Sequence, residues 1–149
     1  MSQPIKEILV ATDFSEGSDE ALGAAIDLAK RTGADLHIVH VLENGADQFP
    51  FGLASYEDRP DLIASLDREL TRRSDWAVRE GIGCQTRMIE EDAVGGILQA
   101  ARDVGADLLV VGTHGRRGIA HALMGSVAAK VVQRASCPVL TVPFSKKAA

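Results

Sequence analysis

The densest group of residues suited to chemistry is a glycine-rich stretch, Gly112-Thr113-His114-Gly115-Arg116-Arg117-Gly118. Its three glycines leave backbone N–H groups able to converge on an anion without side chains in the way. Its two arginines add fixed positive charge and planar donors that suit phosphate oxygens. The stretch therefore predicts a phosphate-binding loop, although Gly112 is also compatible with a strand that simply ends in a turn.

A second anion-binding feature follows, where Gly125-Ser126 opens a predicted helix. A helix N-terminus offers unpaired N–H groups and the positive end of the helix dipole. Each such interaction contributes about 0.3–1 kcal/mol at an exposed site, so several donors must act together. The plainer interpretation is that Ser126 is an ordinary N-cap. The stretch matches neither a Walker loop nor a Gly-x-Gly-x-x-Gly fingerprint.

Acidic and histidine side chains supply further candidates. Asp13 follows the first predicted strand, where an aspartate either contacts a ligand or caps the next helix or turn. Glu90-Glu91-Asp92 follows the third predicted strand, and a turn that caps the third helix is the favoured interpretation. His114 and His121 are candidates for phosphate contacts, but no cysteine or carboxylate cluster accompanies them at metal-ligand spacing. The sequence therefore does not predict a zinc site.

The composition limits the class of protein. The chain has 149 residues, a net charge of −5, 46% hydrophobic residues and 25% charged residues. We expect one domain over residues 1–149, with a core at about 5–143 and a tail at 144–149. The negative charge disfavours non-specific nucleic-acid binding. Cys84 and Cys137 are too few and too far apart for a disulfide framework, so we expect them to act as small apolar residues.

Export and membrane insertion are not expected. Residues 1–7 lack the basic and apolar regions of a signal peptide. No apolar run approaches the ~20 residues that a membrane helix needs. We therefore expect a cytoplasmic protein with neither membrane nor nucleic acid among its partners.

Strand-like and helix-like segments alternate along the chain. The predicted strands are residues 8–11, 36–42, 84–89, 108–111 and 139–142, of which the third alternates with polar residues like an edge strand. The helices between them carry apolar residues at helical spacing, and the last, at 127–135, is expected to bury Val127, Val131 and Val132. Residues 43–60 are expected to form a long loop, acting as a lid, a partner surface or a packed segment. The alternation predicts a parallel, doubly wound sheet, in which ligands bind beyond the carboxyl ends of the strands.

The spacing Gly112-x2-Gly115-x9-Gly125-Ser126 resembles the nucleotide loop of the ATP-binding branch of the universal stress protein family. The resemblance covers nearly the whole chain. Ile8 to Asp13 is similar to the family's first strand and its aspartate, His40-Val41 to the end of the second strand, Asp107 to Gly112 to the fourth, and Cys137-Pro138-Val139 to the start of the fifth. One departure is the acidic run at residues 90–92, where the family often has a glycine.

The resemblance implies a five-stranded sheet of order 3-2-1-4-5 with helices on both faces, in the Rossmann-like, adenine nucleotide alpha hydrolase-like class. It implies ATP as ligand, with a divalent ion such as Mg²⁺ bridging phosphate oxygens. The implied nucleotide contacts are Ala11, Thr12 and Asp13 near the ribose, Val41 at the adenine, Val111 and Gly112 flanking the ribose, and Gly115, Arg116, Gly125, Ser126 and Val127 around the phosphates. It also implies a homodimer through the fifth strand, Val139 to Val142.

Three interpretations of function stay open. The sequence shows no well-placed general base, paired carboxylates or activated nucleophile in the loop, which favours a nucleotide-dependent regulatory or stress-tolerance module. The alternatives are a slow ATPase or self-phosphorylating protein, with Ser126 or Thr113 as acceptor, and a nucleotide-free interaction member of the family. A phospho-receiver domain that uses Asp13 is less favoured, because no acidic pair follows the first strand.

Overall fold

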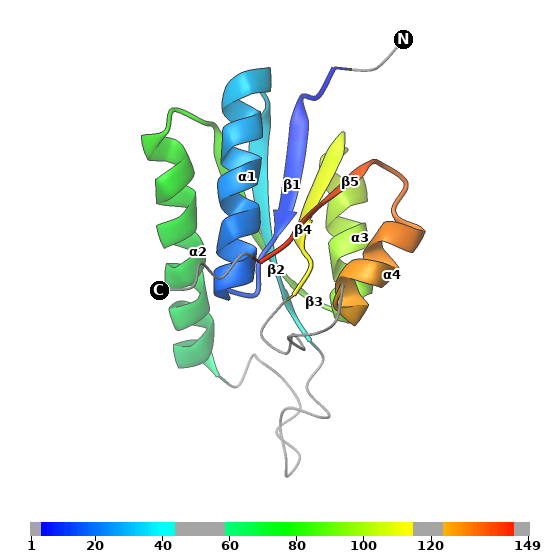
Figure 1. The fold of residues 1–149 in the computed structure, drawn as a ribbon. Coiled ribbons are helices and arrows are strands. Elements are labelled where there is room, and N and C mark those ends of the chain that lie inside the picture. The colour runs from blue at the N-terminus through cyan, green and yellow to red at the C-terminus, as the bar shows by residue number, and fades with distance from the viewer. Residues whose placement is uncertain (1–3, 44–58, 115–123, 145–149) are drawn as a thin grey trace, which may run out of the picture.

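The computed structural model of the chain describes residues 4–43, 59–114 and 124–144 (Figure 1). The strands are β1 (Glu7–Ala11), β2 (Asp35–Leu42), β3 (Cys84–Glu90), β4 (Leu108–Gly112) and β5 (Val139–Val142). The helices are α1 (Glu16–Thr32), α2 (Pro60–Arg79), α3 (Ala93–Val104) and α4 (Ser126–Arg134). The alternation predicted from the sequence is confirmed, and several predicted bounds differ from these by a single residue.

The strands of the described residues form one parallel sheet in the order β3-β2-β1-β4-β5. This order and the position of β3 at an edge confirm the expected topology. β1 and β4 lie side by side where the order reverses, with Val10 paired to Val110. Because the two strands are parallel, the residues that follow them emerge at the same edge of the sheet.

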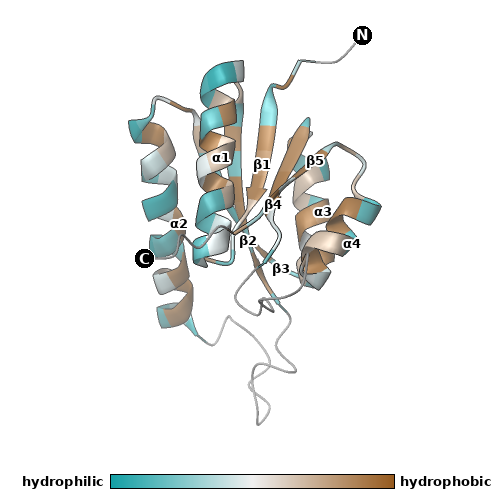
Figure 2. Ribbon diagram, viewed as in Figure 1, coloured by the Kyte–Doolittle hydropathy of each residue, from teal (hydrophilic) through white to brown (hydrophobic). Residues whose placement is uncertain are grey.

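Helices cover both faces of the sheet (Figure 1). Leu22 of α1 and Leu70 of α2 belong to the core cluster on one face, and Ile97 of α3 and Val131 of α4 belong to the cluster on the other. Figure 2 shows the central strands as hydrophobic along most of their length and hydrophilic residues on the outer sides of the helices. Strands buried on both faces explain the continuous apolar runs in the sequence.

Side chains cap the first and third helices, and the sequence predicted the cap of the third. Ser15 is the N-cap of α1 and Asp92 is the N-cap of α3, each accepting a bond from the amide three residues further on. Gly33 and Gly105 end the same two helices with left-handed φ angles of 77° and 63°, which glycine adopts without steric cost. Asp92 thus confirms that the acidic run after β3 caps a helix.

The N-terminus of α4 differs from the prediction. Gly125 is its N-cap, and Ser126 is the first residue of the helix. The interpretation of Ser126 as the N-cap is therefore wrong. A glycine has no side chain to bond the first amides of the helix, and no side-chain cap is present at Gly125.

The buried face of α4 also differs from the prediction. Ala128 and Val131 fill the core, whereas Val127 and Val132 are 37% and 43% exposed. Val127 and Val132 each lie one position outside the pair that faces the sheet, so each turns about 100° away from it. A short helix buries a narrow stripe, and the expectation for these two valines is wrong.

Within the described ranges, no helix has the length and apolar character to cross a membrane.

Candidate functional site

The loops that follow β1 and β4 meet at the first turn of α1. Gly112 packs on Gly17 so closely that a Cβ atom at Gly112 would lie 3.1 Å from the Gly17 carbonyl oxygen. A Cβ atom at Gly17 would lie 2.5 Å from the carbonyl oxygen of His114. On the β1 side, the hydroxyl oxygens of Thr12 and Ser18 are 3.1 Å apart. The first turn of α1 therefore joins the two loops at one edge of the sheet.

The start of α4 is attached to the same loop through Thr113. The Gly125 amide donates to the Thr113 carbonyl oxygen, and the Thr113 amide donates to the Val142 carbonyl oxygen at 3.0 Å. The Thr113 side chain is buried, and its Oγ1 lies 3.0 Å from Nδ1 of His114. These bonds fix the N-terminus of α4 beside the carboxyl ends of β4 and β5.

The first amides of α4 are suited to an anion. The first bond of the helix runs from the Ala129 amide to the Gly125 carbonyl oxygen, at 3.0 Å. The amides of Ser126 and Val127 precede it and so have no acceptor within the helix. No side-chain cap covers them, and the positive end of the helix dipole lies at the same point.

Asp13 lies in a tight turn between β1 and α1. Its Oδ1 accepts hydrogen bonds from the amide of Ser15, at 3.0 Å, and from the Ser15 hydroxyl. The Phe14 amide donates to Oγ1 of Thr12 at 3.0 Å. These side-chain bonds to the backbone stabilise the turn. Asp13 is therefore not the helix cap, which is Ser15, and its half-buried carboxylate lies beyond the end of β1.

Phe14 holds an unusual backbone conformation in this turn. Among the described residues other than glycine, only Phe14 has a positive φ, at 66°. That conformation costs on the order of 1 kcal/mol, so the surroundings must hold it. Its ring centroid lies 4.3 Å from that of His40 and 4.9 Å from Cζ of Arg73. Nothing in the sequence pointed to Arg73, which lies far along the chain in α2.

The remaining strand-end candidates lie beside these loops. Ala11 ends β1 and packs against the core cluster that faces α3 and α4, and Val111, one residue before the end of β4, belongs to that cluster. Val41 lies in β2, two residues beyond Val39, which pairs with Ala11. A Cβ atom at Gly96 of α3 would lie 2.8 Å from both methyl groups of Val41. The Val41 side chain therefore packs directly on α3 at Gly96, near the end of β2.

Some predicted features lie outside the described residues. Gly115 and Arg116 belong to the part of the glycine-rich loop that the structure leaves undescribed, and so do residues 44–58 of the predicted long loop. Of the remaining site residues, Thr12, Asp13, Gly112 and Gly125 are brought together by the contacts above. Val127 follows Ser126 on the partly exposed first turn of α4.

Residues 4–143 match the sequence model of the Universal stress protein family. The chain belongs to the universal stress protein family. It is 35% identical over 147 residues to a universal stress protein of Methanocaldococcus jannaschii, covering 95% of this chain and 84% of that relative.

Two solved structures of universal stress proteins share the fold. One, from Burkholderia pseudomallei, has 31% identity and a TM-score of 0.76, covering 97% of this chain and 100% of the other. The second is a universal stress protein in complex with cAMP, with 29% identity and a TM-score of 0.72, covering 96% of this chain and 100% of the other. The family and the fold expected from the glycine spacing are thus confirmed.

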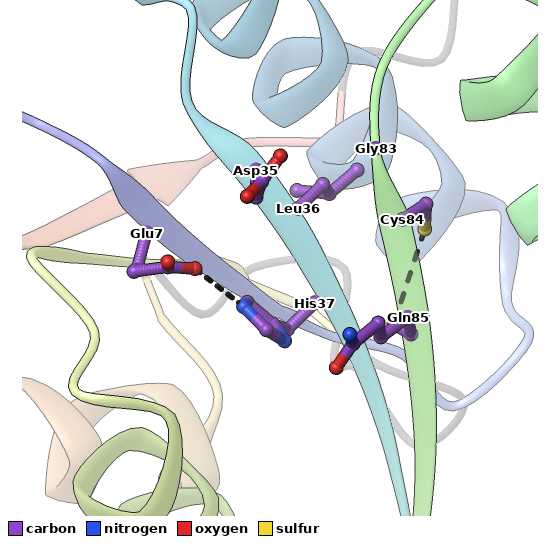
Figure 3. A pocket seen from close by; sticks show the side chains of 7 residues that line it. All are labelled: Glu7, Asp35, Leu36, His37, Gly83, Cys84 and Gln85. Atoms are coloured by element: carbon purple, nitrogen blue, oxygen red, sulfur yellow. Dashed lines mark hydrogen bonds and ion pairs between the residues drawn. The ribbon is translucent and has the colours of Figure 1, made fainter.

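This universal stress protein also has a pocket at the opposite edge of the sheet, where β1, β2 and β3 begin (Figure 3). It has a volume of about 270 Å³ and is lined by Glu7, Asp35, Leu36, His37, Gly83, Cys84 and Gln85. Nε2 of the buried His37 lies 2.6 Å from a Glu7 carboxylate oxygen, while its Nδ1 has no hydrogen-bond partner among the described residues. In the sequence, a histidine inside an otherwise apolar strand is the feature that could have indicated this His37–Glu7 pair. The pocket lies at the amino ends of the strands, away from the edge where such sheets bind ligands.

The cysteines of this universal stress protein behave as packing residues. Both are free thiols, and Cys84 and Cys137 each pack against one of the two core clusters. Burial raises the pKa of the Cys84 and Cys137 thiols. In the parts of the chain that the structure describes, no group of three or more His, Cys, Asp or Glu residues is placed to hold a metal ion.

Proposed function

We propose that this universal stress protein binds ATP at the carboxyl edge of β1 and β4 and acts as a nucleotide-dependent regulatory or stress-tolerance module. The observation that supports it most is the attachment of three elements at one edge. These are the turn with Asp13, the loop that begins at Gly112 and the start of α4 at Gly125, joined through Gly17 and Thr113. The relative solved with cAMP supports an adenine nucleotide as the ligand class.

Each element has a role in this proposal. Asp13 accepts a hydrogen bond from a ribose hydroxyl, with Ala11 and Thr12 beside it. Val111 and Gly112 flank the ribose, and the backbone of Val41 meets the adenine. The uncapped amides of Ser126 and Val127, together with Gly115 and Arg116, hold the phosphates. Glycine at position 112 lets the loop after β4 pack closely on the first turn of α1, because a Cβ atom there would meet the Gly17 carbonyl oxygen.

Mg²⁺ enters the proposal as part of the ligand. The described residues form no cage of three or more metal-ligating side chains. Magnesium commonly keeps several waters and binds phosphate oxygens of a nucleotide. We therefore assign its coordination to the phosphates and water, and we place the protein in the cytoplasm, where ATP with Mg²⁺ is available.

The two candidate acceptors for self-phosphorylation differ in their surroundings. Thr113 is 7% exposed and its hydroxyl bonds to His114. Ser126 is exposed at the start of α4. If the protein phosphorylates itself, Ser126 is the better acceptor. A regulatory module remains the favoured function, since the sequence of the loop offers no well-placed general base or activated nucleophile.

We also propose a homodimer that pairs β5 with its copy. β5 pairs with β4 on one side only, which leaves the backbone groups of its other side at the sheet edge. Leu140, in this edge strand, is an exposed apolar residue at 36%. Light scattering should give twice the chain mass for the wild type and the monomer mass for Leu140→Glu. A wild-type monomer at every concentration rejects the dimer.

Calorimetry with Mg-ATP tests nucleotide binding. Asp13→Asn removes the charge but keeps an oxygen that can accept the Ser15 amide, so the turn survives. We expect the wild type to bind and Asp13→Asn to weaken binding about tenfold, as the loss of one charge-assisted hydrogen bond predicts. The matched control is Asp27→Asn, on the exposed side of α1, where Asp27 pairs with Arg31.

The outcomes separate the proposal from its alternatives. No binding heat with Mg-ATP, ADP, AMP or cAMP at millimolar concentration rejects nucleotide binding and leaves a nucleotide-free interaction protein. If the Asp13→Asn and Asp27→Asn variants bind Mg-ATP with equal affinity, the nucleotide binds at a site that does not include Asp13. The variant Gly125→Val would not test nucleotide binding alone, because a Cβ atom at Gly125 would lie 3.0 Å from the Thr113 carbonyl oxygen and would disturb the fold.

A further inference from the structure

Arg73 of α2 reaches the turn that carries Asp13. Its Nη2 donates to the Phe14 carbonyl oxygen at 3.3 Å, and its Cζ lies 4.9 Å from the centroid of the Phe14 ring. One guanidinium thus contacts both the backbone and the side chain of the residue with the left-handed conformation. A cation over an aromatic face and a bond to a carbonyl are both favourable, and Arg provides both through its planar shape.

Other bonds hold the Arg73 guanidinium in place. Its Nε and Nη2 donate to the two carboxylate oxygens of Asp19, at 2.7 and 3.3 Å. Its Nη1 donates to the Glu69 carboxylate at 2.8 Å and to the Glu69 carbonyl oxygen at 3.1 Å. The side chain is 11% exposed. Burial alone lowers the pKa of Arg73, but the hydrogen bonds to Asp19 and Glu69 outweigh it and raise that pKa.

His40 of β2 also contacts Phe14. The two ring centroids lie 4.3 Å apart, and Nδ1 of His40 lies 2.9 Å from the Thr12 carbonyl oxygen. Phe14 is therefore fixed by a residue of α2 and by a residue of β2. The peptide groups on either side of Phe14 belong to Asp13 and Ser15, which are themselves joined by the Asp13 carboxylate.

From these contacts we infer that Arg73 is a positioning residue for the nucleotide site. By holding Phe14 in its left-handed conformation, Arg73 fixes the direction in which the Asp13 carboxylate is presented beyond β1. Because Arg73 also binds Asp19 in the first turn of α1, one side chain ties α2 to both α1 and the turn. The inference rests on the proposed function, since Asp13 is assigned to the ribose there.

Arg73→Lys tests this role. Lysine keeps the positive charge near Asp19 and Glu69, but it lacks the planar fork that reaches Phe14 at the same time. Phe14 then loses a hydrogen bond and a buried cation–ring contact, and the turn that carries Asp13 is held less firmly. We therefore expect the dissociation constant for Mg-ATP to rise about tenfold. The matched control is Arg72→Lys, the neighbouring arginine, which is 75% exposed and lies 3.6 Å from a Glu69 carboxylate oxygen. We expect its affinity to stay within about twofold of the wild type.

A double-mutant cycle shows whether Arg73 acts through Asp13. Adding Arg73→Lys to Asp13→Asn should weaken binding less than about twofold further, because the group that Arg73 positions is already lost. All affinities are measured well below the melting temperature of each variant, so that only folded protein is compared. If Arg73→Lys lowers the melting temperature but leaves the dissociation constant unchanged, its role is purely structural and the inference is overturned.

The cycle separates this inference from the proposed function. Fully additive effects of Arg73→Lys and Asp13→Asn overturn positioning through Asp13. Wild-type binding with unchanged affinity in Arg73→Lys overturns the Arg73 inference alone. A wild-type chain that binds no adenine nucleotide overturns the proposed function and, with it, any role of Arg73 in nucleotide binding.

Discussion

Gly17 and His114 are in direct backbone contact: a Cβ atom at Gly17 would lie 2.5 Å from the His114 carbonyl oxygen. That distance is far below a normal carbon–oxygen contact, and a backbone atom cannot turn aside as a side-chain end can. We expect Gly17→Ala to lower the free energy of unfolding by about 2 kcal/mol, the size of a typical overpacking effect. Urea denaturation measures it.

Gly23 in the same helix provides the control. A Cβ atom there would lie 3.3 Å from Cη2 of Trp76, the end of a side chain that can shift. Alanine also favours a helix over glycine by roughly 1 kcal/mol. Gly23→Ala should therefore be neutral or stabilising. If Gly17→Ala proves as mild as Gly23→Ala, α1 and the loop after β4 do not touch as described.

Two valines in α4 test the packing of that helix. Val131 is fully buried against the sheet, whereas Val132 is 43% exposed. Val131→Ala should lower the free energy of unfolding by about 2 kcal/mol, because it removes buried methyl groups and leaves a cavity. Val132→Ala should change it by less than about 0.5 kcal/mol. Equal effects of the two substitutions in thermal or urea unfolding would show that the helix faces the sheet differently.

The elements of the fold could be predicted because their signals are local. The apolar run of β1 and the spacing of Leu22 and Ile26 in α1 each indicate their element without knowledge of the rest of the chain. Gly33 and Gly105 follow their helices directly, and a left-handed cap favours glycine at such a position. The exposure of Val127 and Val132 could not be predicted, since the face that a short helix buries depends on its packing.

The site was only partly predictable for a similar reason. Asp13, Gly112 and Gly125 follow strands or begin a helix, and these positions can be identified along the sequence. Arg73 acts on Phe14 from 59 positions along the chain, and no local pattern indicates that pairing. A bulky residue such as Phe14 is also not expected at a positive φ. Contacts between residues that are far apart along the chain could therefore not be predicted from the sequence.

The two thiols should react slowly with alkylating agents. The thiolate is the nucleophile, and burial raises the pKa of Cys84 and Cys137, so less thiolate is present at neutral pH. Iodoacetamide should modify both more slowly than free cysteine at pH 7 to 9, with rates that rise at higher pH than for free cysteine. Mass spectrometry of each cysteine measures this.

The same shift predicts a direction for stability. A thiol pKa that is higher in the folded than in the unfolded chain stabilises the fold below the unfolded pKa, and this stabilisation is lost as pH rises through the folded pKa. Alanine at Cys84 should therefore reduce the loss of stability on the alkaline side. A pH–rate profile for Cys84 or Cys137 that coincides with that of free cysteine contradicts both expectations.

The most direct test of the central claim is an NMR titration of the ¹⁵N-labelled wild-type chain with Mg-ATP. Backbone amide resonances of Asp13, Thr113 and Ser126, at the carboxyl edge of the sheet, should shift with a common saturation curve. Those of His37 and Gln85, in the pocket at the opposite edge, should stay in place. Shifts confined to the amino edge, or no shifts at millimolar Mg-ATP, would contradict nucleotide binding at this site.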